Sequence, residues 1–469
     1  MFRNEFVFDR TKLSSRLSAA LDINQEINAS LNWIYLHGKK FHSMKYKQHL
    51  FFVSLFILLF LRNSHAQDSL FAHRIIDTLT SKTFLGRGYT HDGNNKAARY
   101  IANMFFENKL ESYQGGYYQP FAFDLNSFSG LMQFSIDGKM LDAGKDYIIS
   151  GESKGLKGKY RLVKIESIAS KNSLGDWSYH SVSKKDLLVI DDSTLVGGGV
   201  KSLLKIIEEK KCFGAAGYIE LNSVKLTMDV SETASPFFHL IVLKKSFPVT
   251  KSEAVINIQN KIIHVMTQNI IGYVKGKRMP DSFIVLTAHY DHLGEMGNSV
   301  YFPGANDNAS GTSMLLTLCR YYAQKQNQPD YTIVFIAFSG EEAGLIGSQF
   351  FAQYPLINLN KIKFLINMDI VGTGEEGIKV VNATEFPNQF SLLQNLNDEN
   401  HLLKSVQSRG KAANSDHYPF YLKGVPDFFI YTLGGISAYH DVYDRAETLP
   451  LTKFNDLEIL LKKFIDGLQ

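Results

Sequence analysis

The sequence predicts an α/β fold, with a mixed, mostly parallel central sheet flanked by helices and an inserted mainly β domain. Strand-like and helix-like segments alternate from Asn269 to residue 469, which is typical of a sheet covered on both faces. Between residues 126 and 262, short apolar runs alternate with Gly, Ser, Lys and Asp. A chain of 469 residues is long enough for more than one domain.

The C-terminal region supplies the strands of the central sheet. Residues 332–338 read TIVFIAF and are almost continuously apolar, as expected for a strand buried on both faces. Other strands are predicted at 270–274, 283–288, 363–368, 378–381 and 428–431. Helices are predicted at 312–326, 345–353, 390–403 and 452–468.

Residues 67–125 are expected to form the N-terminal part of the same α/β domain. Apolar residues recur at helical spacing between Ala97 and Phe105, which indicates an amphipathic helix. Arg87 is expected to be structural. In the inserted domain, 126–262, a helix-like stretch precedes Gly-Ala-Ala-Gly-Tyr-Ile at 214–219, and this resembles the protease-associated domain faintly.

Residues 44–66 have the pattern of a secretory signal peptide. Two lysines precede an apolar run at 50–61, and Ser64-His65-Ala66 fits a cleavage site. The run is short for a membrane span. We therefore expect an exported protein, periplasmic or extracellular, whose mature chain starts at Gln67 and has no membrane span. Residues 1–43 are expected to be a non-native upstream extension; the alternative is a cytoplasmic tail before an uncleaved anchor.

Composition excludes some classes of partner and site. Of 50 Lys and Arg, nine lie in residues 1–66 together with four of the 46 Asp and Glu, so the rest of the chain is near neutral. Such a charge balance gives no electrostatic footprint for nucleic acid. Cys212 and Cys319 are the only cysteines, too few for a disulfide framework, and are expected to be free.

Polar side chains that can bind a metal follow the predicted strands of the C-terminal region. Since the carboxyl ends of parallel strands meet at one edge of a sheet, these side chains should converge. Two imidazoles among several carboxylates suit zinc or a related divalent metal, and hydrolases often hold two such ions ~3.5–4 Å apart. The candidates are His289, Asp291, Asp307, Glu341, Glu342, Asp369 and His440.

Six motifs in this region resemble those of the M28 family of zinc aminopeptidases. They are AHYDHLG (288–294), GANDNASG (304–311), SGEEAGLIGS (339–348), NMDIVG (367–372), SDHYPF (415–420) and YHDVYDRAETL (439–449). The resemblance covers residues 269–469 and, less specifically, 85–121. It implies a metallopeptidase domain of the zinc-exopeptidase type over 263–469, completed by 67–125, that binds two Zn²⁺ ions.

The resemblance also assigns roles to single residues. His289 and Asp369 would bind one metal, Glu342 and His440 the other, and Asp307 would bridge them. Glu341 would be the general base. The peptide bond between Asp307 and Asn308 would be cis. Asp416, His417 and Asp444 match family positions without being ligands, and are expected either to be scaffolding or to support the ligands from outside the metal shell.

Asp291 is expected to act on His289 rather than on a metal. Two residues apart on an extended segment, the two side chains share a face. The Asp291 carboxylate could then accept the second imidazole N–H and fix the tautomer.

The implied activity is that of an exported exopeptidase acting on peptides with a free N-terminus. Two alternatives stay open: a glutaminyl cyclase on the same fold, and a non-catalytic binding protein. The Asp-Asn-Ala-Ser-Gly sequence at 307–311 favours the peptidases over the cyclases. Neither the preferred N-terminal residue nor the oligomeric state follows from the sequence.

Overall fold

The computed structural model describes residues 69–113, 115–165, 182–191, 204–205, 207–209, 211–248 and 253–468. The predicted signal peptide at 44–66 and the upstream residues 1–43 lie outside these ranges. Within them, no helix is both long enough and apolar enough to cross a membrane.

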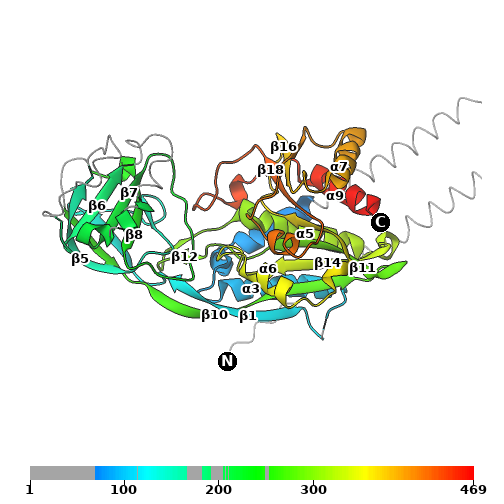
Figure 1. The fold of residues 1–469 in the computed structure, drawn as a ribbon, viewed down its shortest axis with the longest axis horizontal. Helices are drawn as coiled ribbons and strands as arrows, with labels where there is room; N and C mark the ends of the chain where they lie inside the picture. Colours follow the sequence, from blue (N-terminus) through cyan, green and yellow to red (C-terminus); the bar gives the residue numbers. More distant parts are fainter. Residues whose placement is uncertain are drawn as a thin grey trace, which may run out of the picture. The chain divides into compact units, whose positions relative to one another are not determined.

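The predicted α/β fold is confirmed, with an eight-stranded mixed sheet at its centre (Figure 1). Four strands in the middle are parallel: β14 (Tyr331–Phe338), β11 (Met279–His289), β15 (Ile362–Met368) and β18 (Asp427–Leu433). β16 (Gly377–Val381) and β17 (Val406–Ser408) extend the sheet beyond β18, and β10 (Lys261–Val274) and β1 (Tyr118–Ser127) extend it beyond β14.

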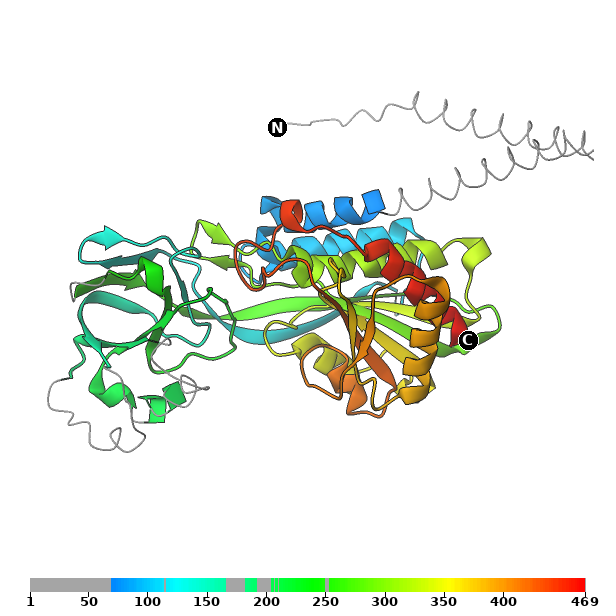
Figure 2. The ribbon, with the colours of Figure 1, turned by 90° about the horizontal axis from the view of Figure 1, so that it is seen from above.

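Helices cover both faces of this sheet, because alternate residues of each central strand point to opposite sides. In β14, Phe335 packs in one core with helices α3 (Gly93–Glu107), α5 (Gly311–Tyr322), α7 (Pro387–Asn400) and α9 (Phe454–Gly467). Its neighbour Val334 packs in another core with α6 (Ile346–Gln353) and α8 (Tyr418–Tyr421). Figure 2 shows α3 and α5 lying along one face of the sheet.

The residues between β1 and β10 form a second eight-stranded sheet, in the order β3-β2-β9-β5-β6-β7-β8-β4. Strands β5 to β8 are mutually parallel, and the others pair antiparallel. The bounds are β2 Met132–Ile136, β3 Lys139–Met140, β4 Tyr147–Ile149, β5 Leu156–Lys164, β6 Asp186–Asp191, β7 Gly217–Asn222, β8 Phe238–Leu243 and β9 Glu253–Ile258. We call residues 132–258 the inserted domain.

A two-stranded ribbon links the two sheets. β1 and β10 pair antiparallel from Tyr118 opposite Ile270 to Ser127 opposite Lys261. Only the last part of β10, from Ile270 to Val274, also pairs with β14. The predicted strand at 270–274 therefore extends back to Lys261, and Figure 1 shows the paired strands running between the sheets.

The inserted domain also packs against loops of the central sheet. Its apolar core includes Leu293, Met296 and Phe302, which follow β11, and Val442 near the C-terminus. All four side chains are at most 5 % exposed. The loops beyond the carboxyl ends of the central strands are therefore held partly by the inserted domain.

Candidate metal centre

The candidate ligands converge at the carboxyl edge of the parallel strands. His289 is the last residue of β11, and Asp369 directly follows β15. Glu341 and Glu342 lie in the turn after β14, and Asp307 lies in the turn before α5. His440 lies in the loop after β18.

Asp307 stands between two pairs of side chains. Its Oδ1 lies 3.4 Å from His289 Nε2, and its Oδ2 lies 2.9 Å from His440 Nε2. His289 Nε2 also lies 3.3 Å from Asp369 Oδ1, and His440 Nε2 lies 3.1 Å from Glu342 Oε2. One carboxylate therefore faces two separate imidazole–carboxylate pairs, with one oxygen directed to each.

These distances fit two divalent metal ions. Around a tetrahedral zinc with bonds of about 2.05 Å, neighbouring ligand atoms are about 3.3 Å apart. Asp369 Oδ1 is buried and has no hydrogen-bond partner among the described residues, so a cation would satisfy it. Mixed imidazole and carboxylate donors are also the set that zinc prefers.

The turn that carries Asp307 is fixed by backbone hydrogen bonds. The buried carboxylate of Asp444 accepts the N–H groups of Asn306 at 2.8 Å and Asp307 at 3.0 Å. The peptide bond between Asp307 and Asn308 is cis, as the resemblance predicts. Asn308 in turn donates from Nδ2 to the carbonyl of Met368, which precedes Asp369. Asp444 therefore holds the turn that carries Asp307 in place, which agrees with a scaffolding role.

Arg87 is completely buried and donates hydrogen bonds to the same turn. Its guanidinium donates five hydrogen bonds of 2.7–3.2 Å, every one to a backbone carbonyl. The acceptors belong to Leu79, Tyr290, Pro303, Gly304 and Asp307. Arg87 thus has a structural role, because its side chain ties the carbonyl of Leu79 to the turn that carries Asp307.

Replacing Arg87 by lysine should destabilise the protein. An ammonium has three donors, so at least two buried carbonyls would lose their partners, at about 1–3 kcal/mol each. We expect the free energy of unfolding in urea to fall by about 3 kcal/mol. Arg99→Lys is the matched control, since Arg99 pairs with Asp92 at the surface and should change stability by less than about 1 kcal/mol. Equal effects of the two substitutions would contradict this role.

Asp291 makes different contacts from those expected. His289 Nδ1 lies 3.2 Å from the backbone carbonyl oxygen of Asp291. The carboxylate oxygen Oδ1 of Asp291 is farther from the same nitrogen, at 3.7 Å. The carboxylate instead accepts the N–H groups of Glu341 and Glu342, at 3.3 and 3.2 Å, and the hydroxyl of Tyr89. Asp291 thus fixes the turn that carries both glutamates, and its main chain orients His289.

Glu341 lies beside the two imidazole–carboxylate pairs without belonging to either of them. Its Oε2 lies 3.9 Å from His289 Nε2, too far for a hydrogen bond but at the rim of the cluster. Burial raises the pKa of Glu341 well above its ordinary value; the charge of His289 opposes this, and the carboxylates of Glu342 and Asp416 add to it. A carboxylate with a raised pKa holds a transferred proton more readily than an ordinary glutamate does.

His292 also belongs to the site, and no role was predicted for it from the sequence. It is fully buried, and its Nδ1 lies 2.6 Å from Glu342 Oε1. Burial alone would raise the pKa of Glu342, but His440 and His292 lower it to about 2. His292 therefore holds one oxygen of Glu342, leaving the other for the cluster. The signal was present in AHYDHLG, whose second histidine is His292.

Asp416 and His417 lie in the protein interior. Both are fully buried, and neither is among the side chains that face Asp307. Burial lowers the pKa of His417 to about 3, so it is neutral, and raises the pKa of Asp416 to about 7. Ser415 of the same motif donates to Asp369 Oδ2 at 3.0 Å.

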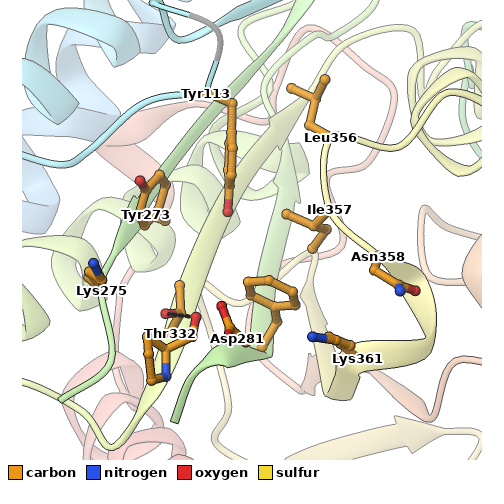
Figure 3. Close-up of a pocket in the computed structure, with 11 residues that line it drawn as sticks. Tyr113, Tyr273, Lys275, Asp281, Thr332, Leu356, Ile357, Asn358 and Lys361 are labelled. Atoms are coloured by element: carbon orange, nitrogen blue, oxygen red, sulfur yellow. Dashed lines mark hydrogen bonds between the residues drawn. The ribbon is translucent and has the colours of Figure 1, made fainter. Parts of the chain in front are cut away.

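A groove of about 470 Å³ lies elsewhere on the domain (Figure 3). It is lined by Tyr113, Tyr273 and Thr332, among others. Thr332 lies at the start of β14, at the opposite end of the strand from the metal-binding edge. The groove is therefore separate from the candidate site.

Comparison with known proteins points to one family. Residues 269–465 match peptidase family M28. A "probable zinc metalloprotease" of Pyricularia oryzae is 40 % identical over 120 residues, 24 % of this chain and 23 % of the relative. Aminopeptidase YwaD of Bacillus subtilis is 34 % identical over 163 residues, 34 % of each chain. The chain thus spans about a quarter to a third of the length of these relatives.

Solved structures match over a larger part of the chain. A zinc aminopeptidase from Bacillus subtilis superposes with a TM-score of 0.63, covering 84 % of this chain and 94 % of that one at 22 % identity. An aminopeptidase from Aneurinibacillus sp. strain AM-1 gives a TM-score of 0.60, covering 84 % and 92 % at 19 % identity. At such identities, these similarities show that the fold is shared.

Proposed function

We propose that the chain is an exported zinc-dependent aminopeptidase that removes N-terminal residues from peptides, because residues 269–465 match the model of peptidase family M28. The observation that carries this proposal is Asp307, whose two oxygens face two separate imidazole–carboxylate pairs. In the proposed site, His289 and Asp369 hold one Zn²⁺ ion and Glu342 and His440 hold the other.

The proposed reaction is hydrolysis of the first peptide bond. Two bound zinc ions would supply Lewis-acid chemistry, which lowers the pKa of a bound water and polarises a carbonyl group. Glu341 accepts a proton from that water and passes it to the leaving amine. Asp291 keeps Glu341 at its distance from His289 by holding the backbone N–H groups of the glutamate turn.

Export is supported by the sequence of residues 44–66. Two lysines, an apolar run at 50–61 and a small-residue cleavage site form the three parts of a secretory signal. The two cysteines need no oxidising compartment, since both are free and buried. Export therefore rests on the leader alone.

Removing and restoring the metal tests the proposed activity. Purified protein should release the fluorophore from at least one substrate in a panel of aminoacyl derivatives. Treatment with a chelator should lower turnover on the order of 10³-fold, because the attacking water loses its activation. Zinc should restore it. Cyclisation of peptides with N-terminal glutamine, without release from any aminoacyl substrate, would identify a glutaminyl cyclase instead.

A further inference from the structure

The loop that carries His440 is held by a segment of the inserted domain, which lies more than two hundred positions earlier in the chain. His440 Nδ1 lies 2.9 Å from the carbonyl oxygen of Met228, 212 residues away. In return, the Met228 N–H donates to the His440 carbonyl at 2.8 Å. This reciprocal pair fixes both the main chain and the side chain of His440, which has a left-handed φ of 53°.

The hydrogen bond at Nδ1 determines what Nε2 can do. An imidazole that donates from Nδ1 to a carbonyl presents an unprotonated Nε2 to a metal, so the partner of Nδ1 sets the tautomer. Nε2 of His440 is the atom that faces Asp307 and Glu342. The matching partner of His289 is the carbonyl of Asp291, which belongs to the metal-binding domain itself.

Lys225 strengthens the contact next to this pair. Its Nζ donates to the carbonyls of Ser437 and Tyr439, each at 3.2 Å, and lies 5.4 Å from the centre of the Tyr439 ring. The Tyr439 ring stacks on the His440 imidazole with the ring centres 3.9 Å apart. The hydrogen bonds from Lys225 and the stacked ring of Tyr439 thus limit the rotation of the His440 side chain.

The segment that makes these contacts is anchored in the inserted domain. The Met228 side chain is 4 % exposed and packs in the apolar core of that domain, together with Val442 from the His440 loop. Residues on both sides of the contact therefore share one core, and the contact depends on how the inserted domain is seated.

We propose that the inserted domain acts as a positioning element for one of the two metal ions, through the segment Lys225–Met228. This inference rests on the proposed function, because it assigns His440 to a metal. The two positions should then differ in their dependence on the inserted domain. Occupancy at the Glu342–His440 pair relies on Lys225–Met228, and occupancy at the His289–Asp369 pair does not.

Zinc binding by Lys225→Met tests the inference. Full-length protein is dialysed against zinc buffers of graded free concentration, and bound zinc per chain is measured by mass spectrometry. We expect the wild type to bind two ions and the variant to bind one as tightly, with the other about tenfold weaker, as for the loss of an outer contact to a metal ligand. Lys225→Arg, which keeps the donors, should behave as the wild type does.

Two further variants complete the experiment. Lys139→Met replaces an exposed lysine elsewhere in the inserted domain and should bind both ions as the wild type does. Met228→Ala removes the packing of the same segment against the core and should again weaken the binding of one zinc ion only. This variant replaces Lys225→Met in the test if circular dichroism shows that Lys225→Met does not fold. Unchanged binding, or equal weakening of both ions, overturns the inference. A wild type that binds no pair of ions overturns the proposed function instead.

Discussion

Glu341→Gln is expected to lower kcat on the order of 10³-fold while both metal ions stay bound. The amide cannot accept a proton from the attacking water, and a general base contributes typically 10²- to 10⁴-fold. The amide keeps the size of the carboxyl group, and Glu341 is not a member of either imidazole–carboxylate pair. Steady-state kinetics should therefore show a fall in kcat with a small change in KM.

Metal analysis separates loss of the base from loss of the site. Zinc content of Glu341→Gln should equal that of the wild type. Glu399→Gln, at an exposed position on α7, is the control and should retain full activity. Undiminished kcat in Glu341→Gln would remove Glu341 from the role of base, and a loss of zinc would make it a ligand.

Asp307→Asn is expected to weaken both metal ions together, by at least about 100-fold each. The two oxygens of Asp307 face different partners, so an amide can serve at most one ion and presents an N–H group to the other. The lost negative charge also raises the cost of holding two cations side by side. Zinc bound after dialysis should fall from two ions per chain towards none, and activity should fall with it.

Asp427→Asn is the matched control for this substitution. Asp427 is likewise buried, but lies at the start of β18 and accepts a hydrogen bond from Asn382 at 2.7 Å. Burial raises its pKa to about 8, so its carboxyl is already neutral near pH 7 and an amide replaces it without loss of charge. Loss of a single ion in Asp307→Asn would show that the carboxylate belongs to one position and does not bridge.

The central sheet could be predicted from the sequence because burial dictates composition there. The run TIVFIAF is apolar on both faces and coincides with β14 to within a residue. β17, with only Val406, Gln407 and Ser408, is too short for a periodic pattern and was not predicted. β1 lies in a stretch rich in Tyr, Gly and Phe that indicates extended chain but no partner; its pairing with β10 is a tertiary fact.

The residues of the candidate site could be predicted from the sequence, but their contacts could not. Histidines and carboxylates at strand ends mark the cluster, and the structure brings all five candidate ligands together. The contacts of those ligands were not predictable, since they join distant residues. His292 meets Glu342 50 residues away, and His440 meets Met228 through a backbone carbonyl that no side-chain pattern encodes. The same holds for Arg87, whose five acceptors are all main-chain atoms.

The ribbon of β1 and β10 has a consequence for how the chain reaches this structure. Its strands are separated by the whole inserted domain, so their pairing must close a long loop, and the entropic cost of closure rises with the logarithm of loop length. The inserted domain is a continuous stretch whose strands pair with one another. Once the inserted domain has folded, residues near Ser127 and Lys261 lie opposite each other. The loop that must be closed to pair β1 with β10 is then short. Folding of the inserted domain thus lowers the kinetic barrier to the pairing of β1 with β10, since non-local pairing limits folding rates.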